Sequence, residues 1–477
     1  MRIAIAPLWL LLAGISAALM ASDPPAARSD AEFDAAINAK LAETSAPEVV
    51  GVAYASAEDG VVTKQGSWGE MERDSGNPIA DDTVFIIGSV SKSFTALAVM
   101  QLVEAGEISL DEPAGTYLPA LRDTPAGEPS VRQFLSHTSG FSMVQGNESQ
   151  DDTSMAHDAL ARRISVAATM TPAKQPGTVW DYSNVNYQVL GRIVEIVSGQ
   201  SYADYVEQKI LAPAGMADSF VHDAGDRPNM ANGHRPWFGT FQSINGNLTG
   251  RGSSPQGGIV SSARDMARYL SILMNGEDDI LSAAGKATMM SPASEFSPEY
   301  GFGWFIDAEQ GTVFHSGANP GFEALATMIP AQKRATAVLV NNSSGLAFGH
   351  TLPTRNAITA ASLDLPYDGE ASPMTMRVAF IVLALLPFLY LLGMWRAWRG
   401  RGSQRSGMAG QIALYLPLLV MVALAYVFVI AIPTMFGAPF AAAAIFQPDT
   451  GVLLAGAAIM GVVWAVWRIA MARLAKP

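Results

Sequence analysis

Hydrophobic positions divide the 477-residue chain into parts with different patterns. Uncharged apolar stretches lie at residues 3–20 and after Met376, whereas the long part between them mixes apolar and polar residues over short segments. A helix needs about 20 apolar residues to span a bilayer. We therefore expect a leader over residues 1–21, a globular domain over 22–375 and a membrane region over 376–477.

The globular part begins and ends with strand patterns. Residues 49–55 and 61–68 flank Glu58-Asp59-Gly60, which predicts a β-hairpin. Further strands are predicted at the other end of the domain, at residues 312–315, 323–329 and 335–341. Strands at both ends predict an antiparallel sheet formed by the N- and C-terminal parts of the domain.

The middle of the domain has helical spacing. Residues 186–198 and 262–274 are amphipathic, and Ser262 with Asp265 forms a candidate capping box. We expect an α+β fold. The pattern alone predicts a sheet flanked by helices, with an inserted helical lobe and a cleft where the lobes meet.

The first 21 residues have the pattern of a secretory signal peptide. They carry one charge, Arg2, then the apolar run 3–20, with small residues at its end. An uncleaved N-terminal anchor is the alternative, and the sequence does not decide whether the segment is removed.

Three uncharged segments predict transmembrane helices at about 378–395, 412–432 and 452–467. The connector after the first carries four arginines and the C-terminal tail carries three basic residues, whereas the connector after the second carries only Asp449. The positive-inside rule then predicts that the C-terminus is cytoplasmic and that residues 22–375 lie on the far side of the membrane. A signal peptide agrees with that orientation.

Charge and composition narrow the function further. Residues 22–375 contain 21 Lys and Arg against 42 Asp and Glu, a net charge near −21, which disfavours nucleic acid as a partner. The chain has no cysteine, so it has no disulfide, thiol nucleophile or Cys-ligated metal. Its six histidines are dispersed, and we expect neither a metal nor another cofactor.

The strongest candidate for chemistry is Ser89-Val90-Ser91-Lys92, at the start of an apolar helical pattern that ends at Gly106. A serine and a lysine one turn apart can form an acylating nucleophile without a histidine base. Amides at the helix N-terminus would favour negative charge developing beside the serine. A Ser/Lys pair on a solvated helix face is the alternative, although Lys92 alone among eight lysines has a serine three residues before it.

Two further segments can complete such a site. Tyr182 and Asn184 offer a phenol and an amide in a predicted loop. A cation beside the tyrosine would lower the pKa of its phenol, so that Tyr182 could act as a base. The alternative is that Tyr182 only caps the next helix. The segment His315-Ser316-Gly317-Ala318 has a strand pattern leading into a glycine, and the Ala318 amide could join that of Ser89 in an oxyanion hole. His315 taken alone is equally a structural histidine.

In this order, the three segments resemble the serine β-lactamase and penicillin-binding family, most closely its class C and esterase-like branch. That family has Ser-x-x-Lys, Tyr-x-Asn and Lys/His-Thr/Ser-Gly motifs. The resemblance covers about residues 30–345 and also includes residues 133–140, 257–267 and 300–304. It implies the β-lactamase/transpeptidase-like fold. His137, in the first of these segments, looks structural in the family.

The resemblance implies a mechanism of serine acylation. Ser89 would attack a carbonyl, and Lys92 and Tyr182 would relay its proton to the leaving group. The amides of Ser89 and Ala318 would hold the oxyanion, and water would release the acyl group. By the same resemblance Asn184 positions Lys92 and the substrate, and three residues of the opposite wall bind substrate: His315, Ser316 and Gly317.

One departure from the family narrows the expected substrate. Most β-lactamases and D-alanyl-D-alanine peptidases have lysine at the position of His315, and a histidine that is mostly neutral holds a substrate carboxylate less well. We therefore expect a neutral ester, an amide or a D-amino-acid peptide as a small-molecule or peptide substrate, rather than a β-lactam. Membrane lipid is the other expected partner. We expect the protein in a bacterial inner membrane, with its catalytic domain in the periplasm.

Other functions stay open from the sequence. A penicillin-binding D-alanyl-D-alanine peptidase or a β-lactamase would use the same motifs. A non-catalytic ectodomain that senses a ligand is a further alternative, although the predicted cytoplasmic segments are too short for an output domain. A standard α/β-hydrolase is disfavoured because the chain contains no Gly-x-Ser-x-Gly.

Overall fold

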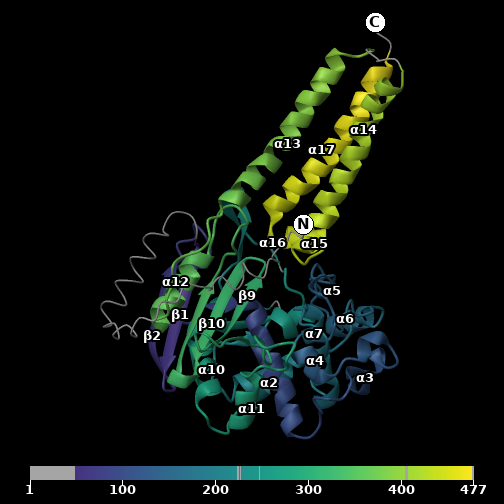
Figure 1. Ribbon diagram of the computed structural model, residues 1–477. Coiled ribbons are helices and arrows are strands. Elements are labelled where there is room, and N and C mark those ends of the chain that lie inside the picture. The colour runs from purple at the N-terminus through teal and green to yellow at the C-terminus, as the bar shows by residue number, and fades with distance from the viewer. Residues whose placement is uncertain (1–48, 223–224, 226, 247, 403–406, 475–477) are drawn as a thin grey trace.

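The structure is a computed structural model that describes residues 49–222, 225, 227–246, 248–402 and 407–474. It consists of an α/β domain from which three long helices rise (Figure 1). The expected signal peptide at 1–21, and residues 22–48 of the expected domain, lie outside the described residues. The fold class predicted from the sequence is confirmed.

A six-stranded antiparallel sheet joins the two ends of the domain, in the order β2-β1-β11-β10-β9-β8. The predicted hairpin is present as β1 (Gly51–Glu58) and β2 (Val61–Gly69). Its two turn residues, Asp59 and Gly60, both have positive φ, as the tight turn of a two-residue hairpin requires. Strand β1 pairs with β11 (Arg334–Val340), which brings Val52 opposite Val340.

The other half of the sheet carries the third sequence segment. The predicted strands are β9 (Thr312–Asn319), β10 (Phe322–Ile329) and β11, and a short edge strand, β8 (Phe305–Asp307), pairs with β9. Strand β9 continues four residues beyond the apolar pattern that predicted it. Its last residues face β10, with Ala318 opposite Glu323, so the segment from Ser316 to Ala318 is held in a regular strand.

Helices cover both faces of this sheet. Helix α10 (Ala263–Met274) packs on one face against β1 and β11, and α12 (Leu352–Leu363) packs on the other, where Ile358 joins a buried cluster with Val338 and Val340. Ser262 caps α10, since its side chain accepts from the Asp265 amide. The other half of the predicted capping box is wrong, because the Asp265 carboxylate accepts from the Asp218 amide and the Ser219 hydroxyl. Helix α12 was not predicted because its apolar and polar positions do not separate cleanly into two faces.

The inserted lobe is helical, as expected. Its long helices are α2 (Ser91–Glu104), apolar on all sides and almost wholly buried, and α7 (Asn184–Ser198). Short helices complete it: α3 (Ala114–Tyr117), α4 (Val131–Leu135), α5 (Met143–Gly146), α6 (Ala159–Ala167), α8 (Tyr202–Val206), α9 (Ser254–Gly257) and α11 (Ala283–Met289). Two small sheets lie between the lobe and the main sheet. One contains β3 (Val84–Ile86), β7 (Ile259–Ser262) and β4 (Phe220–Val221), and the other contains β5 (His234–Trp237) and β6 (Thr240–Ser243).

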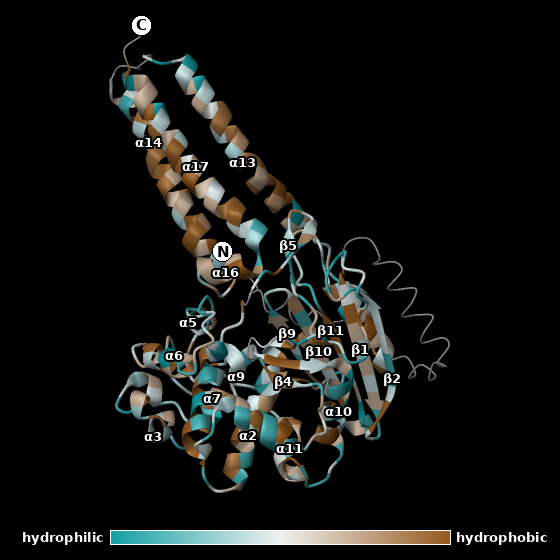
Figure 2. Cartoon of the chain, turned by 180° about the vertical axis from the view of Figure 1, so that it is seen from behind, coloured by the Kyte–Doolittle hydropathy of each residue, from teal (hydrophilic) through white to brown (hydrophobic). Residues whose placement is uncertain are grey.

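The C-terminal region contains three helices that are long and apolar enough to cross a membrane. They are α13 (Met374–Arg399), α14 (Gly407–Tyr426) continuing through a π turn into α15 (Ile432–Met435), and α17 (Pro448–Arg473). Their surfaces are largely hydrophobic along their length (Figure 2). Each is longer than its predicted segment because the helix continues into the flanking polar and basic residues.

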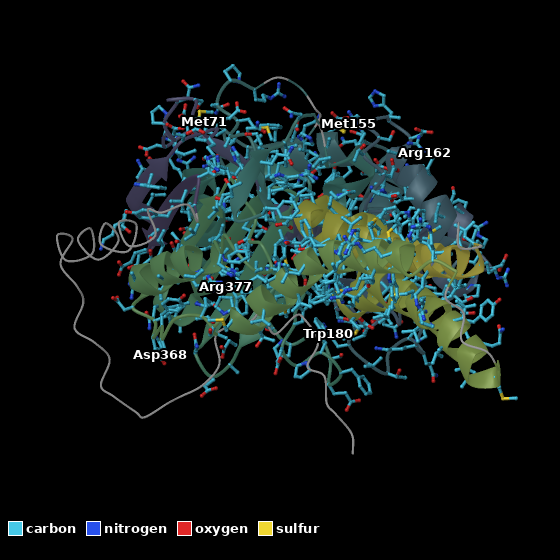
Figure 3. All side chains as sticks on the ribbon, turned by 90° about the horizontal axis from the view of Figure 1, so that it is seen from above. Met71, Met155, Arg162, Trp180, Asp368 and Arg377 are labelled. Carbon is cyan, nitrogen blue, oxygen red and sulfur yellow. The ribbon has the colours of Figure 1, made fainter. Side chains whose placement is uncertain are left out.

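A short helix that was not predicted, α16 (Phe440–Phe446), joins α15 to α17 and lies against the α/β domain. The Gln447 side chain after it accepts from the Leu346 amide at 3.1 Å and donates to the Ser344 carbonyl at 2.7 Å. Arg235 donates to the Ile445 carbonyl at 3.0 Å. Viewed from above, the three membrane helices overlie the domain to which these bonds attach them (Figure 3).

Candidate active site

Ser89 lies in a 3₁₀ turn, Gly88–Val90, directly before α2. The sequence placed it within the first turn of the helix; the helix instead begins at Ser91, and Ser89 is presented by the turn that precedes it. Gly88 has φ of 54°, and a Cβ there would lie 2.6 Å from the Ala318 amide nitrogen. Glycine is therefore required for the turn to approach β9, and Ser89 itself is only half-buried.

Lys92 lies beneath Ser89 and is fully buried. Its Nζ is 3.0 Å from Ser89 Oγ, 2.8 Å from Asn184 Oδ1 and 2.9 Å from the Gln256 carbonyl oxygen. None of these three partners carries a charge that would favour the ammonium form. Burial therefore holds the pKa of Lys92 well below its usual value.

The partners of Lys92 also set the direction of its lone pair. A neutral amine has two N–H donors and one lone pair, and the carbonyl oxygens of Asn184 and Gln256 can only accept. Both donors are therefore taken. The lone pair is left facing Ser89 Oγ at 3.0 Å, where it can receive the hydroxyl proton.

Gln256, which the sequence analysis did not single out, is held in place by a buried network. Its side chain accepts from Gln188 Nε2 at 2.6 Å and donates to Gln150 Oε1 at 2.9 Å. Thr95 Oγ1 on α2 donates to the neighbouring Pro255 carbonyl at 2.6 Å. Helix α9 is thus fixed against α2, which fixes the carbonyl that Lys92 meets. The only sequence signal was its position next to Gly257-Gly258, a pair shared with the related family.

Tyr182 lies in the loop before α7, with its hydroxyl hydrogen-bonded to Ser89. Burial raises the pKa of this phenol far above its usual value, and the bond to Ser89 only partly opposes that rise. The predicted lowering of this pKa by a nearby cation is wrong in direction, because burial of the phenol is the largest influence on it. Lys92 Nζ lies over the ring, 4.9 Å from its centroid. Tyr182 does not cap α7 either; Ser183 occupies the N-cap.

His137 holds the loop that presents Tyr182. Its Nδ1 accepts from the Ser183 amide at 3.1 Å and faces Asn186 Nδ2 at 2.9 Å, and its ring centroid is 4.3 Å from that of Tyr182. The residue is fully buried, with positive φ. These contacts agree with the structural role that its sequence segment suggested.

The end of β9 forms the wall opposite Tyr182. A Cβ on Gly317 would overlap the Ile87 carbonyl oxygen, so only glycine lets β9 lie this close to the turn that carries Ser89. Asn319 Nδ2 donates to the Gly257 carbonyl at 2.7 Å and ties the strand end to α9. Ala318 is exposed, and its amide nitrogen lies close to Gly88, the residue before Ser89. Two backbone amides near a nucleophile can share an oxyanion, the role predicted for Ser89 and Ala318.

His315 lies behind the site. It is buried, its Nδ1–H donates to the Ser316 carbonyl at 2.7 Å, and its Nε2 accepts from the Tyr300 hydroxyl at 3.2 Å. Burial, with a smaller contribution from Lys92, lowers the pKa of His315 to about 3. Both ring nitrogens are therefore occupied and the ring is neutral. The direct substrate contact that the resemblance implied for His315 is not what this geometry offers; Ser316 and the backbone of Gly317 remain on the wall.

The predicted residues thus come together around Ser89, and the backbone carbonyl of Gln256 and the side chain of Asn147 join them. Asn184 Nδ2 donates to Asn147 Oδ1 at 2.8 Å, and Asn147 follows α5 in a loop with no motif of its own. Within the described part of the chain, no group of three or more His, Cys, Asp or Glu could hold a metal ion. The arrangement is that of a serine nucleophile with an amine base, a neutral phenol and a backbone oxyanion site.

Comparison with known proteins gives a consistent picture. Residues 33–361 match the family described as Beta-lactamase. The chain is 30% identical to "Penicillin-binding protein 4" of Amycolatopsis lactamdurans over 323 residues, 63% of this chain and 83% of that protein.

Two solved structures illustrate the structural likeness. The octameric penicillin-binding protein homologue from Pyrococcus abyssi matches with 27% identity and a TM-score of 0.60, covering 76% of this chain and 81% of that one. The D-amino acid amidase from Ochrobactrum anthropi SV3 matches in fold, with 24% identity and a TM-score of 0.58, over 70% of this chain and 99% of that one.

Proposed function

Because the chain belongs to the β-lactamase family of serine hydrolases, we propose that it is a membrane-anchored hydrolase that forms an acyl-enzyme on Ser89. The bond it cleaves is an ester, an amide or a D-amino-acid peptide bond. One observation carries this proposal: Lys92 is fully buried, with a lowered pKa, and its Nζ lies 3.0 Å from Ser89 Oγ. That pairing activates a serine without a histidine base.

The reaction proceeds in two halves. Ser89 Oγ bonds to the substrate carbonyl carbon while its proton passes to Lys92, and the amides of Ser89 and Ala318 hold the oxyanion. The bond to the leaving group then breaks; Tyr182 donates its hydroxyl proton to that group and regains one from Lys92. Water next attacks the acyl carbon and gives a proton to Lys92, which returns it to Ser89 Oγ as the acid departs.

The surroundings of His315 support an uncharged substrate. A family member with lysine at this position has a cation beside the oxyanion site to hold a carboxylate. His315 here is neutral and both of its nitrogens are bound to protein atoms. The D-amino acid amidase found among the structural neighbours carries its function in its name, and we take an amide or ester without a free carboxylate as the preferred substrate class.

A penicillin-binding peptidase is the second candidate. The names of the Amycolatopsis lactamdurans protein and the Pyrococcus abyssi homologue favour it, and so does a hydrolase domain attached to a membrane region. Penicillin would acylate such an enzyme at Ser89, and hydrolysis of the resulting acyl-enzyme would be slow.

The direction of the membrane helices supports the proposed orientation. The ends of α13 and α17 remote from the α/β domain carry most of their basic residues, among them Arg396, Arg399, Arg468 and Arg473. Arg377, at the near end of α13, donates to the Ala347 carbonyl of the domain. By the positive-inside rule the remote ends are cytoplasmic, and the hydrolase domain lies in the periplasm of a bacterial inner membrane.

The proposal is tested with the purified full chain in detergent. We expect hydrolysis of p-nitrophenyl esters or D-amino-acid amides, reduced by Ser89→Ala roughly 10³-fold or more, with nitrocefin turned over poorly. Full activity in Ser89→Ala would exclude this nucleophile. Efficient nitrocefin hydrolysis would replace the preferred substrate with a β-lactam, and a stable penicillin adduct on Ser89 without ester turnover would favour the second candidate.

A further inference from the structure

A loop of the membrane region reaches the hydrogen bonds of the active site. Gly437, buried between α15 and α16, accepts a bond from Asn147 Nδ2 at 2.9 Å through its carbonyl oxygen. Asn147 Oδ1 accepts from Asn184 Nδ2, and Asn184 Oδ1 accepts from Lys92 Nζ. An unbroken series of bonds therefore connects Ser89 with a backbone carbonyl of the membrane region.

The chemistry of the two ends fixes the direction of every bond in this series. A backbone carbonyl can only accept, so Asn147 must turn its NH₂ toward Gly437 and its oxygen toward Asn184. Asn184 must then give its NH₂ to Asn147, which leaves its own oxygen facing Lys92. The Gly437 carbonyl thus selects the amide orientation that takes an N–H of Lys92 and leaves the lone pair for Ser89.

The loop is held in this place by contacts of its own. Gly437 has φ of 75°, and a Cβ on it would overlap Met143 Sδ on α5, so the loop and α5 are in close contact. Arg235 and Gln447 bind the neighbouring backbone, as described above. The active site also faces this side. Ser89 lies in the turn directly before α2, and the last residue of that helix, Glu104, binds Ser282 at the start of α11 through its carboxylate. Helix α11 is remote from the membrane helices in both views (Figures 1 and 2).

We propose that the loop between α15 and α16 is a working part of the active site, and that Asn147 is the positioning residue through which the Gly437 carbonyl keeps Lys92 directed at Ser89. This inference rests on the proposed serine hydrolase function. If the loop is part of the site, the reaction requires the membrane region to be bound to the hydrolase domain. The reaction then takes place at the end of that domain that faces the bilayer. A substrate held at the membrane surface has the shortest path to that end.

Loss of the loop contact has a defined chemical consequence. Without the Gly437 carbonyl, Asn147 and then Asn184 can turn over and present an NH₂ group to Lys92. That group occupies the lone pair and removes an acceptor that stabilises the ammonium form. The catalytic rate falls, while the pKa of Lys92, seen in the acid limb of the rate profile, moves lower.

The first test is Gly437→Ala in the full chain, with Gly407→Ala as the matched control. Both glycines have positive φ in the membrane region, but nothing lies near a Cβ on Gly407, whereas one on Gly437 meets Met143. We expect Gly437→Ala to lower kcat for a small p-nitrophenyl ester about ten- to hundred-fold, with KM little changed and the acid limb shifted to lower pH. Gly407→Ala should match the unmodified chain.

The second test is Asn147→Ala, alone and combined with Gly437→Ala. If Gly437 acts through Asn147, the double variant loses no more activity than the single variants. Additive losses, or a loss of kcat with the acid limb unmoved in variants of normal thermal midpoint, would overturn the inference. So would equal activity in Gly437→Ala and Gly407→Ala. If the unmodified chain hydrolyses neither an ester nor a D-amino-acid amide in a Ser89-dependent way, the proposed function itself fails, a result distinguishable from all of these.

Discussion

At the residue scale, the reactivity of Ser89 depends on what surrounds one lysine. A lysine in water is a cation at neutral pH and cannot take a proton. Lys92 becomes a base because it is fully buried among neutral partners, and the same burial keeps the Tyr182 phenol protonated. Burial therefore shifts the two pKa values in opposite directions, that of Lys92 downward and that of Tyr182 upward.

This sets the expected pH profile. Activity requires Lys92 without its proton and Tyr182 with its own, so kcat/KM should rise through the pKa of Lys92, which burial has lowered, and stay level into the alkaline range because burial has raised the pKa of Tyr182. Lys92→Arg should lower activity roughly 10²–10⁴-fold at every pH, since arginine keeps its proton. Steady-state rates between pH 5 and pH 10 check both statements, and a profile that falls with rising pH across that range would contradict them.

Individual residues also show where prediction of the site from the sequence succeeded and where it failed. Ser89, Lys92, Tyr182 and Asn184 were predicted because their types and spacing carry the chemistry. Gln256 and Asn147 were not, because one acts through its backbone carbonyl and the other through an amide in a loop, neither of which leaves a spacing pattern. The direction of the Tyr182 pKa shift was missed for a related reason: burial cannot be read from neighbours in sequence.

At the scale of elements, the site depends on how α9 is fastened to α2. Thr95 is fully buried on α2 and its Oγ1 lies 2.6 Å from the Pro255 carbonyl and 2.7 Å from the Tyr202 hydroxyl. The next residue, Gln256, supplies the carbonyl that Lys92 meets. Several long helices and all but one strand of the six-stranded sheet could be predicted from periodicity. In contrast, α9, α12 and α16 are set by tertiary contacts that periodicity does not report.

Thr95→Val tests this fastening. The substitution keeps the shape but leaves a buried carbonyl and a buried phenol without their partner, so the free energy of unfolding should fall by about 1–3 kcal/mol. The ester hydrolysis rate should fall with it, because the Gln256 carbonyl is no longer fixed. Thr288→Val, at an exposed threonine of α11, is the control and should change stability by less than about 0.5 kcal/mol. Denaturant unfolding and ester kinetics give both quantities; equal effects in the two variants would contradict the prediction.

At the scale of the whole molecule, the C-terminal region is a neighbour of the active site and, in the proposed function, also its membrane anchor. Its helices overlie the hydrolase domain, and α16 with its flanking residues is hydrogen-bonded to that domain at several points. The proposed orientation places the arginine-rich helix ends in the cytoplasm. The chain contains no cysteine, so a single introduced thiol reports on one position alone.

The orientation can be checked with two such variants in bacterial spheroplasts. Glu277→Cys lies on an exposed loop of the hydrolase domain, and Gly400→Cys lies at the far end of α13 and leaves every arginine in place. A membrane-impermeant maleimide should label Glu277→Cys in intact spheroplasts and Gly400→Cys only after permeabilisation. The reverse result would place the hydrolase domain in the cytoplasm.

The pairing of β1 with β11 also governs the order in which this protein can fold. A central pair of the sheet joins Val52 to Val340, so the first hairpin lacks its neighbour until almost the whole domain has been synthesised. Helix α13 begins soon afterwards, at Met374. Contacts so distant in sequence make folding slow, because a long stretch of chain must be ordered before they form. The sheet therefore closes at about the time the first membrane helix is made, and a chain stopped before β11 would expose an unpaired edge on β1.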